Sequence, residues 1–194
     1  MKKAVFIDRD GIINQMTYID GKFDSPKKVS QVKLVKGVAE VIAWLNKKRI
    51  PVVEVTNQPD VALEKYDLKT LEEIEKKIHY LLNKKAAKVN KIYRCLHHPK
   101  SHYSDLNIDC DCRKPKSGML IQAAKELDID LKKSVVIGDN ATDMEVGRNM
   151  GCKTVLFFHE NDIQEKVNIN KRYQADYKVY SHKQVKEVII QLFK

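Results

Sequence analysis

The stretch Ala4-Val5-Phe6-Ile7-Asp8-Arg9-Asp10-Gly11 decides the fold. Four apolar residues run without interruption into an aspartate, which is typical of a buried parallel strand that ends in a polar residue. Two later runs have the same form: residues 51–55 lead into Thr56-Asn57-Gln58, and residues 134–137 lead into Gly138-Asp139. We therefore predict a parallel sheet whose carboxyl edge carries polar side chains.

Amphipathic stretches separate these strands. Apolar residues recur at helical spacing in four of them: 37–48, 67–81, 117–127 and 139–149. Asp67 and Ser117 are suitable N-caps, and Gly151 closes the fourth helix. The remaining elements are expected as strands at 91–94 and 153–158, and as a last strand and terminal helix after Tyr177. This alternation predicts an α/β fold, a Rossmann-like parallel sheet with helices on both faces.

The length and charge of the chain limit its function. Its 194 residues are expected to form one domain, 1–194. The 36 Lys and Arg exceed the 26 Asp and Glu by ten, but the lysines are scattered, so we interpret them as a solvated surface in preference to a nucleic-acid site. No apolar run approaches the roughly 20 residues that span a bilayer. We expect a soluble, cytoplasmic monomer without a membrane partner.

Aspartates gather at the predicted ligand-binding edge. In open α/β sheets, ligands bind outside the carboxyl ends of the strands. That edge receives Asp8 and Asp10 from the first strand, Thr56 from the second, and Asp139 with Asp143 from the fourth. Such carboxylates suit a hard cation such as Mg²⁺, while the Thr56 hydroxyl and an ammonium could hold phosphate oxygens. One aspartate alone could merely cap a turn, but their joint placement favours a metal and phosphate site.

Three cysteines and a histidine lie in the irregular stretch after residue 94: Cys95, His97, Cys110 and Cys112. Three thiolates and one imidazole are the ligand number and type of a closed tetrahedral Zn²⁺ site. The competing interpretation is a loop of reduced thiols with an incidental histidine, because each pair is spaced more tightly than in common zinc motifs. His98 and His102 are alternative ligands, and Cys152 is expected to be a small buried hydrophobe.

The polar motifs follow the order of a known family. Asp8-Arg9-Asp10-Gly11, Thr56, Lys114 before a helix, and Gly138-Asp139-Asn140-Ala141-Thr142-Asp143 resemble the four motifs of the haloacid-dehalogenase-like phosphohydrolases. The resemblance implies that Asp8 is a nucleophile that forms an aspartyl-phosphate. It implies that Asp10 protonates the leaving oxygen and then deprotonates the hydrolytic water.

The same resemblance implies the rest of the site. Its Mg²⁺ ligands would be Asp8, the backbone carbonyl of Asp10, and Asp139. Thr56 and Lys114 would clamp the phosphoryl oxygens, and Asp143 would support the metal site from behind the ligands. All these assignments depend on the matched motif positions in this sequence.

The cysteine loop narrows the resemblance. Cys95-x-His97-His98-Pro99 and Cys110-Asp111-Cys112-Arg113-Lys114-Pro115 closely resemble the D-glycero-D-manno-heptose-1,7-bisphosphate 7-phosphatases. This implies a structural zinc in a loop at about 95–112 that replaces a large cap domain, and a small phosphorylated sugar as substrate. Arg113 would offer a planar fork of donors to the sugar or its second phosphate, while Asn14 and Thr56-Asn57-Gln58 would line the same pocket.

Three positions depart from that family. Ile12 stands where threonine is usual, Pro59-Asp60-Val61-Ala62-Leu63 replaces Ser-Gly-Ile-Ala-Arg, and Asn140 replaces lysine. These changes leave the phosphoryl-transfer motifs intact and bear on the choice of sugar. Histidinol phosphate is the runner-up substrate, and the charge of +10 supports a nucleic-acid 3′-phosphatase as a further alternative. A zinc-scaffolded interaction module without catalysis is disfavoured, because every catalytic residue of the motifs is present.

Overall fold

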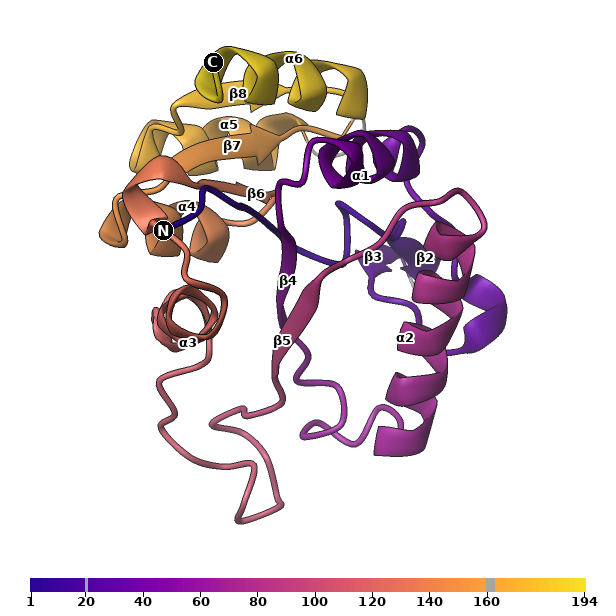
Figure 1. Ribbon diagram of the computed structural model, residues 1–194. Coiled ribbons are helices and arrows are strands. Elements are labelled where there is room, and N and C mark those ends of the chain that lie inside the picture. Colours follow the sequence, from indigo (N-terminus) through magenta and orange to yellow (C-terminus); the bar gives the residue numbers. More distant parts are fainter. Residues whose placement is uncertain (20, 160–162) are drawn as a thin grey trace.

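The computed structural model describes residues 1–19, 21–159 and 163–194. Its centre is a six-stranded sheet in the order β5-β4-β1-β6-β7-β8 (Figure 1). The strands are β1 (Val5–Ile7), β4 (Val52–Asn57), β5 (Lys91–Cys95), β6 (Val135–Gly138), β7 (Lys153–Phe157) and β8 (Tyr177–Val179). All neighbouring strands pair in parallel. The predicted parallel α/β sheet is confirmed.

Strand β1 lies inside the sheet because it is apolar on both faces. Val5, Phe6 and Ile7 are all buried, as expected of a strand that helices cover on each side. Val5 pairs with Val52 of β4 and with Val135 of β6, so the three strands run in step. This register brings the residues that follow β1, β4 and β6 to one edge of the sheet.

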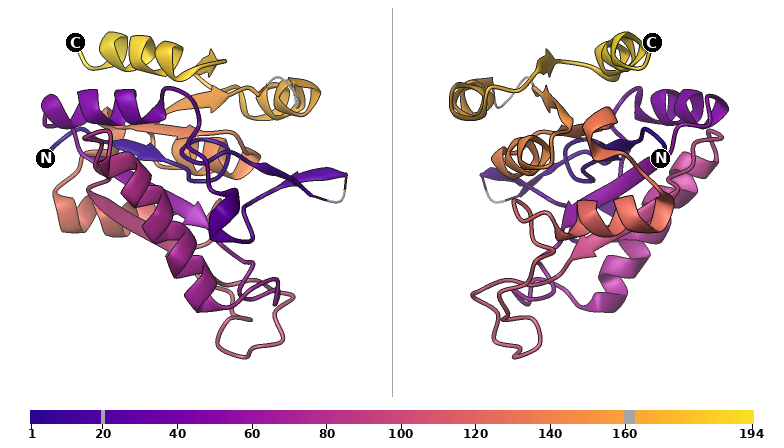
Figure 2. Two further views of the ribbon diagram at one scale, coloured as in Figure 1. Left: turned by 90° about the vertical axis from the view of Figure 1, so that its right-hand side faces the viewer. Right: turned by 60° about the vertical axis from the view of Figure 1, so that its left-hand side comes forward.

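Helices cover both faces of the sheet, as predicted (Figures 1 and 2). They are α1 (Val38–Lys47), α2 (Leu68–Asn83), α3 (Gly118–Leu127), α4 (Ala141–Asn149), α5 (Ile163–Tyr173) and α6 (His182–Leu192). One core packs α1, α2 and α6 against Val5 and Ile7, while another packs α3 and α4 against Phe6. Successive β1 side chains therefore enter opposite cores, which is the period of a strand.

The helix ends show which local signals decide structure. The Asp67 side chain accepts a hydrogen bond of 2.8 Å from the backbone N–H of Thr70 and caps α2 as predicted. Gly151 follows α4 with a φ of 71°, a left-handed conformation that glycine adopts without strain. Ser117 precedes α3, but its side chain makes no capping hydrogen bond. Ser117 therefore occupies the predicted N-cap position, but the predicted capping hydrogen bond is wrong.

The structure contains a hairpin that the sequence patterns above do not predict. Strands β2 (Thr17–Ile19) and β3 (Lys22–Asp24) pair in antiparallel fashion and project from the body of the molecule (Figure 2, left). The available signal is the dipeptide Asp-Gly at 20–21, which favours two-residue hairpin turns. Two short 3-10 helices, Val29–Gln31 and Leu131–Lys133, complete the described elements. In the described ranges, neither the hairpin nor the long β5–α3 loop forms a large cap, as predicted.

No helix among the described residues combines the length and the apolar character needed to cross a membrane.

Candidate functional site

A cavity of about 340 Å³ opens at the carboxyl edge of the sheet. Eight of the sequence-predicted residues line it: Asp8, Asp10, Thr56, Asn57, Gln58, Arg113, Lys114 and Asp143. Segments after β3, β4 and β6 supply further lining residues, including Ser25, Asp60, Lys65 and Asn140. The parallel register explains this meeting, because it ends β1, β4 and β6 at one edge.

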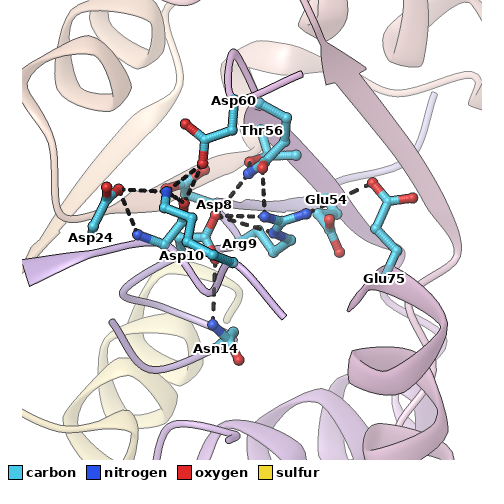
Figure 3. Close-up of polar contacts among 12 residues, drawn as sticks. Asp8, Arg9, Asp10, Asn14, Asp24, Glu54, Thr56, Asp60 and Glu75 are labelled. Atoms are coloured by element: carbon cyan, nitrogen blue, oxygen red, sulfur yellow. Dashed lines mark hydrogen bonds and ion pairs between the residues drawn. The ribbon is translucent and has the colours of Figure 1, made fainter. Parts of the chain in front are cut away.

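Asn14 is the predicted pocket residue that the structure places elsewhere. It is fully buried, and its amide nitrogen donates to the backbone carbonyl of Gln15 at 2.8 Å and lies 3.4 Å from Asp10 Oδ1. Its own oxygen accepts from the backbone N–H of Lys33 at 3.2 Å. Figure 3 shows Asn14 beyond Asp10 in the polar network. Asn14 therefore contacts Asp10 and the backbone and does not line the cavity.

Three carboxylates form a compact acidic cluster: Asp8, Asp139 and Asp143 each offer an oxygen within 4.8 Å of the other two. All three side chains are buried. Burial raises the pKa of Asp8 to about 7 despite the opposing charge of Lys114, and it raises the pKa of Asp143 as well. A cation would counter both effects, because a nearby opposite charge favours the ionised form. The cluster has the ligand chemistry of a hard divalent cation.

The Lys114 ammonium is fixed among these carboxylates. Its Nζ lies 2.8 Å from Asp8 Oδ1 and 2.5 Å from Asp143 Oδ1, and it donates to the backbone carbonyl of Val55 at 2.8 Å. Burial acts to lower the pKa of Lys114, but the charges of Asp143 and Asp8 outweigh it and raise that pKa above its usual value. Lys114 therefore stays charged and places a fixed positive charge beside Asp8.

Two glycines allow the cluster to be this compact. Gly11 has a φ of 88°, and a Cβ atom there would lie 2.3 Å from Asp139 Oδ2. A Cβ atom on Gly138 would lie 2.3 Å from Asp143 Oδ2. Any larger residue at either position would displace a carboxylate. The two glycines therefore let the carboxylates of Asp139 and Asp143 lie close to the backbone.

Asp139 has neighbours that the sequence did not indicate. Its Oδ1 accepts a hydrogen bond of 2.8 Å from the side-chain amide of Asn140, and its Oδ2 lies 3.6 Å from Nε2 of His159. His159 follows β7, so its approach to the loop after β6 depends on the neighbouring strands of the sheet. Asn140 therefore contacts the acidic cluster at one of the positions that depart from the family.

Asn57 holds the backbone that carries Lys114. Its side-chain nitrogen donates to the Lys114 carbonyl at 3.0 Å, and its oxygen accepts from the Lys114 N–H at 3.0 Å. The Asn57 side-chain amide thus bonds both the N–H and the C=O of Lys114, as the backbone of a neighbouring strand would. Asn57 thus ties the end of β4 to the segment that presents Lys114 to Asp8.

The predicted zinc ligands come together in the β5–α3 loop. Cys95, His97, Cys110 and Cys112 each place one ligand atom within 4.8 Å of the others. Cys110 Sγ lies 3.2 Å from Cys112 Sγ and 3.6 Å from Cys95 Sγ, and His97 Nδ1 lies 3.2 Å from Cys112 Sγ. A tetrahedral ion with Zn–S bonds of ~2.3 Å holds its sulfurs roughly 3.8 Å apart, close to this spacing. The four donors thus fit a zinc ion.

The other thiol and imidazole groups are placed differently. His98 Nδ1 accepts the backbone N–H of Lys100 at 3.1 Å, and neither His98 nor His102 belongs to a candidate metal cluster within the described ranges. Cys152 is buried in the core that packs against Phe6, and burial raises the pKa of its thiol to about 12. The interpretation of Cys152 as a buried hydrophobe is confirmed.

Arg113 links the cysteine cluster to the cavity. It follows Cys112 directly, its Nη1 donates to the backbone carbonyl of His97 at 3.1 Å, and it lines the cavity beside Lys114. The path of the cysteine loop therefore sets the position of the Arg113 guanidinium.

Four charged residues, of which Asp24, Asp60 and Lys65 line the cavity, join the hairpin to the loop after β4. Lys27 Nζ lies 2.5 Å from Asp60 Oδ2 and 3.0 Å from Asp24 Oδ1. Lys65 Nζ lies 3.0 Å from Asp60 Oδ1 and 3.3 Å from Asp24 Oδ2. Burial acts to raise the pKa of Asp60, but hydrogen bonds from Lys27, Ser25 and Lys65 lower it. Asp60, which departs from the family pattern, is the centre of this ion-pair cluster.

The fold, the acidic cavity and the fixed lysine define the class as an HAD-like hydrolase, and the family model "HAD-hyrolase-like" matches residues 111–181. Two curated relatives have names that state a particular activity within this class. The D-glycero-beta-D-manno-heptose-1,7-bisphosphate 7-phosphatase of Haemophilus influenzae is 36% identical over 158 residues, 80% of each chain. The D-glycero-alpha-D-manno-heptose-1,7-bisphosphate 7-phosphatase of Campylobacter jejuni is 34% identical over 81% of this chain and 83% of its own.

A solved structure is also similar over nearly the whole chain. The D,D-heptose 1,7-bisphosphate phosphatase from B. bronchiseptica, crystallised with magnesium and phosphate, superposes with a TM-score of 0.81 and 26% identity, covering 97% of this chain and 98% of that one. The chain belongs to the HAD-like hydrolase family, in its D-glycero-D-manno-heptose-1,7-bisphosphate 7-phosphatase branch.

Proposed function

We propose that this chain removes the 7-phosphate from D-glycero-D-manno-heptose 1,7-bisphosphate through an aspartyl-phosphate intermediate. The observation that carries the proposal is the buried cluster of Asp8, Asp139 and Asp143, in which Asp8 and Asp143 contact Lys114, in a chain of this family. Relatives with α- and β-anomeric names are similar to the chain to nearly the same degree, 34% and 36%, so the proposal covers the heptose bisphosphate class.

The proposed chemistry begins with Asp8. A carboxylate oxygen of Asp8 attacks phosphorus as the bond from phosphorus to the sugar oxygen breaks, and the leaving oxygen takes a proton from Asp10. Asp10 then removes a proton from water, the water oxygen attacks phosphorus, and inorganic phosphate leaves with Asp8 restored. Thr56 and Lys114 hold the phosphoryl oxygens, and their places at the cavity wall support that role.

We propose Mg²⁺ as the cation of the acidic cluster. Asp8, Asp139 and the backbone carbonyl of Asp10 would hold it, and the mutual approach of the carboxylate oxygens within 4.8 Å supports the fit. A cation held by these residues would neutralise charge on the phosphoryl group. Asp143 would support the site without binding the cation. One of its oxygens accepts from Lys114 Nζ, and the other accepts from the Asn140 N–H at 3.1 Å.

We propose a structural Zn²⁺ in the cysteine loop, distinct from the catalytic cation. The convergence of Cys95, His97, Cys110 and Cys112 supports it, and the bond from Cys112 to Arg113 couples the loop to the cavity. The Arg113 guanidinium would then bind the sugar or its second phosphate.

A substrate panel tests this function. Both anomers of the heptose bisphosphate, histidinol phosphate and a 3′-phosphorylated oligonucleotide are assayed with Mg²⁺, and ³¹P NMR identifies the phosphate that leaves. We expect the highest kcat/KM for a heptose bisphosphate, with release from C7. A higher value for histidinol phosphate or for the oligonucleotide contradicts the proposal.

The covalent step has its own test. Asp8→Asn keeps the shape of the side chain and removes its charge, so turnover should fall by more than about 1,000-fold. Asp105→Asn, at an exposed aspartate of the cysteine loop, is the matched control and should keep full activity. Near-normal turnover of Asp8→Asn would refute the aspartyl-phosphate.

A further inference from the structure

The two oxygens of the Asp10 carboxylate have unequal surroundings. Oδ2 accepts three N–H bonds: from Arg9 Nη2 at 2.8 Å, from Arg9 Nε at 3.2 Å and from Gln58 Nε2 at 2.7 Å. Oδ1 has a longer contact of 3.4 Å with the amide nitrogen of Asn14. Figure 3 shows Asp10 in this network together with Arg9 and Asn14. The protein therefore holds the Asp10 carboxylate mainly through Oδ2.

Gln58 can point its amide in one direction only. Its Oε1 accepts from Arg9 Nη2 at 2.5 Å, while its Nε2 donates to Asp10 and to Thr56 Oγ1, the latter at 2.9 Å. Arginine has donors and no acceptor, so the reversed amide would set two donors against each other beside Arg9 and two acceptors against each other beside Asp10. Arg9 therefore fixes the orientation of the Gln58 amide, in which an N–H faces Asp10.

Arg9 is held from its other side by buried carboxylates. Its side chain is fully buried, and its Nη1 lies 3.8 Å from Oε1 of Glu75, while Glu54 is buried nearby (Figure 3). Burial acts to lower the pKa of Arg9, but Asp10 and Glu54 outweigh it and raise that pKa. The guanidinium stays charged and in place, so it can orient Asp10 but cannot exchange protons with it.

We propose that Arg9 and Gln58 are positioning residues that reserve Oδ1 of Asp10 for proton transfer. The inference rests on the proposed function, which makes Asp10 the general acid and base. A proton on Oδ2 would point at three N–H donors and would displace at least one, whereas Oδ1 has only the longer contact with Asn14 among the described residues. The O–H bond that breaks when the leaving oxygen is protonated is then Oδ1–H, and Oδ1 later takes the proton from water.

The same geometry prepares Thr56. Because its Oγ1 accepts from Gln58 Nε2, its own O–H is directed elsewhere and can donate toward the cavity that Thr56 lines. Gln58, itself 2% exposed, therefore acts on both neighbours through its amide. This makes positioning, more than direct ligand binding, the role of Gln58.

The test uses the need of the leaving group for a proton. A sugar alkoxide must be protonated as it leaves, whereas p-nitrophenolate leaves without help, so a misplaced general acid slows the first substrate more than the second. Gln58→Met keeps the size of the side chain and removes both N–H bonds. For the heptose bisphosphate we expect kcat to fall by about 10- to 100-fold while KM changes by less than about threefold. The burst of p-nitrophenol from p-nitrophenyl phosphate should slow by less than about threefold.

Companion variants separate positioning from a packing defect. Gln58→Glu keeps the shape but places an acceptor against Asp10 until the new carboxyl takes a proton and becomes a donor, so its activity should recover as pH falls, whereas that of Gln58→Met should not. Arg9→Lys keeps a charge but loses the fork and should show the leaving-group dependence of Gln58→Met. Gln15→Met is the matched control, because the Gln15 amide bonds only to the carbonyl of Leu34 within the described structure, and it should behave as wild type.

Asp10→Asn is the benchmark that distinguishes the two possible failures. If Asp10→Asn slows both substrates equally, Asp10 is not the general acid and the proposed function fails at that step. If Asp10→Asn shows the leaving-group dependence but Gln58→Met and Arg9→Lys slow both substrates equally, or remain fully active, the positioning inference is overturned while the function stands.

Discussion

Replacing His182 with leucine should remove a large acid sensitivity from the stability of this protein. His182 begins α6 and is 1% exposed, with its ring 5.0 Å from that of Phe157. Neither ring nitrogen makes a hydrogen bond of normal geometry within the described residues. Burial lowers the pKa of His182 to about 4; His159 adds to that effect, while the backbone of Lys36 and the Glu40 carboxylate oppose it. The imidazole is therefore neutral in the folded protein at neutral pH.

The magnitude follows from the difference between the folded and unfolded states. A pKa of about 4 in the folded state against about 6.5 in the unfolded chain means that the unfolded chain binds the proton first as pH falls. The neutral His182 contributes its full stability above about pH 6.5, and that contribution is lost as pH falls toward 4. The loss is about 2 kcal/mol at pH 5 and roughly 3 kcal/mol near pH 4.

Urea unfolding at a series of pH values measures this effect. The difference in unfolding free energy between His182→Leu and wild type isolates the titration, because the other ionisable groups cancel. We expect that difference to move by about 2 kcal/mol in favour of the variant between pH 7.5 and pH 5. His102→Gln, at an exposed histidine, should show no such trend. A His182→Leu difference that is constant across this range would refute the reasoning.

Three further predictions concern the loops around the cavity. Metal analysis of the purified protein should find one zinc per chain, and the Cys110→Ser variant should contain none. The variant's kcat/KM should fall by about 100-fold while its circular-dichroism spectrum stays unchanged, because Arg113 follows the proposed ligand Cys112 and bonds to His97. Asn57→Ala should lower the unfolding free energy by about 1–3 kcal/mol and kcat/KM by about tenfold in denaturation and kinetic assays, since it removes both backbone bonds to Lys114. Asp60→Asn should weaken the ion pairs to Lys27 and Lys65, so hydrogen exchange in the hairpin should accelerate. Zinc-free yet fully active protein, a neutral Asn57→Ala, or unchanged hairpin exchange would each contradict the corresponding contact.

Much of the fold and site could be predicted because the signals are local. An apolar run such as Val5-Phe6-Ile7 specifies a buried strand wherever its neighbours lie, and the acids that follow such runs must meet once the strands are parallel and in step. The meeting of Cys95, His97, Cys110 and Cys112 was predictable for a similar reason, since thiols and an imidazole carried by one loop can converge on a common point.

The sequence by itself therefore determined the parallel sheet, the identity of the clustered acids and the composition of the cysteine site, because each depends on residue type and on short spacing along the chain. Only the tertiary structure decided which way the intervening polar side chains point. Arg9 lies between two aspartates that line the cavity yet turns inward toward Glu75, and Asn14 lies beyond Asp10 and off the cavity wall. The partners of such side chains are remote in sequence, as Asn57 is from Lys114, and a hydrogen bond across that distance forms only after the sheet has brought the segments together.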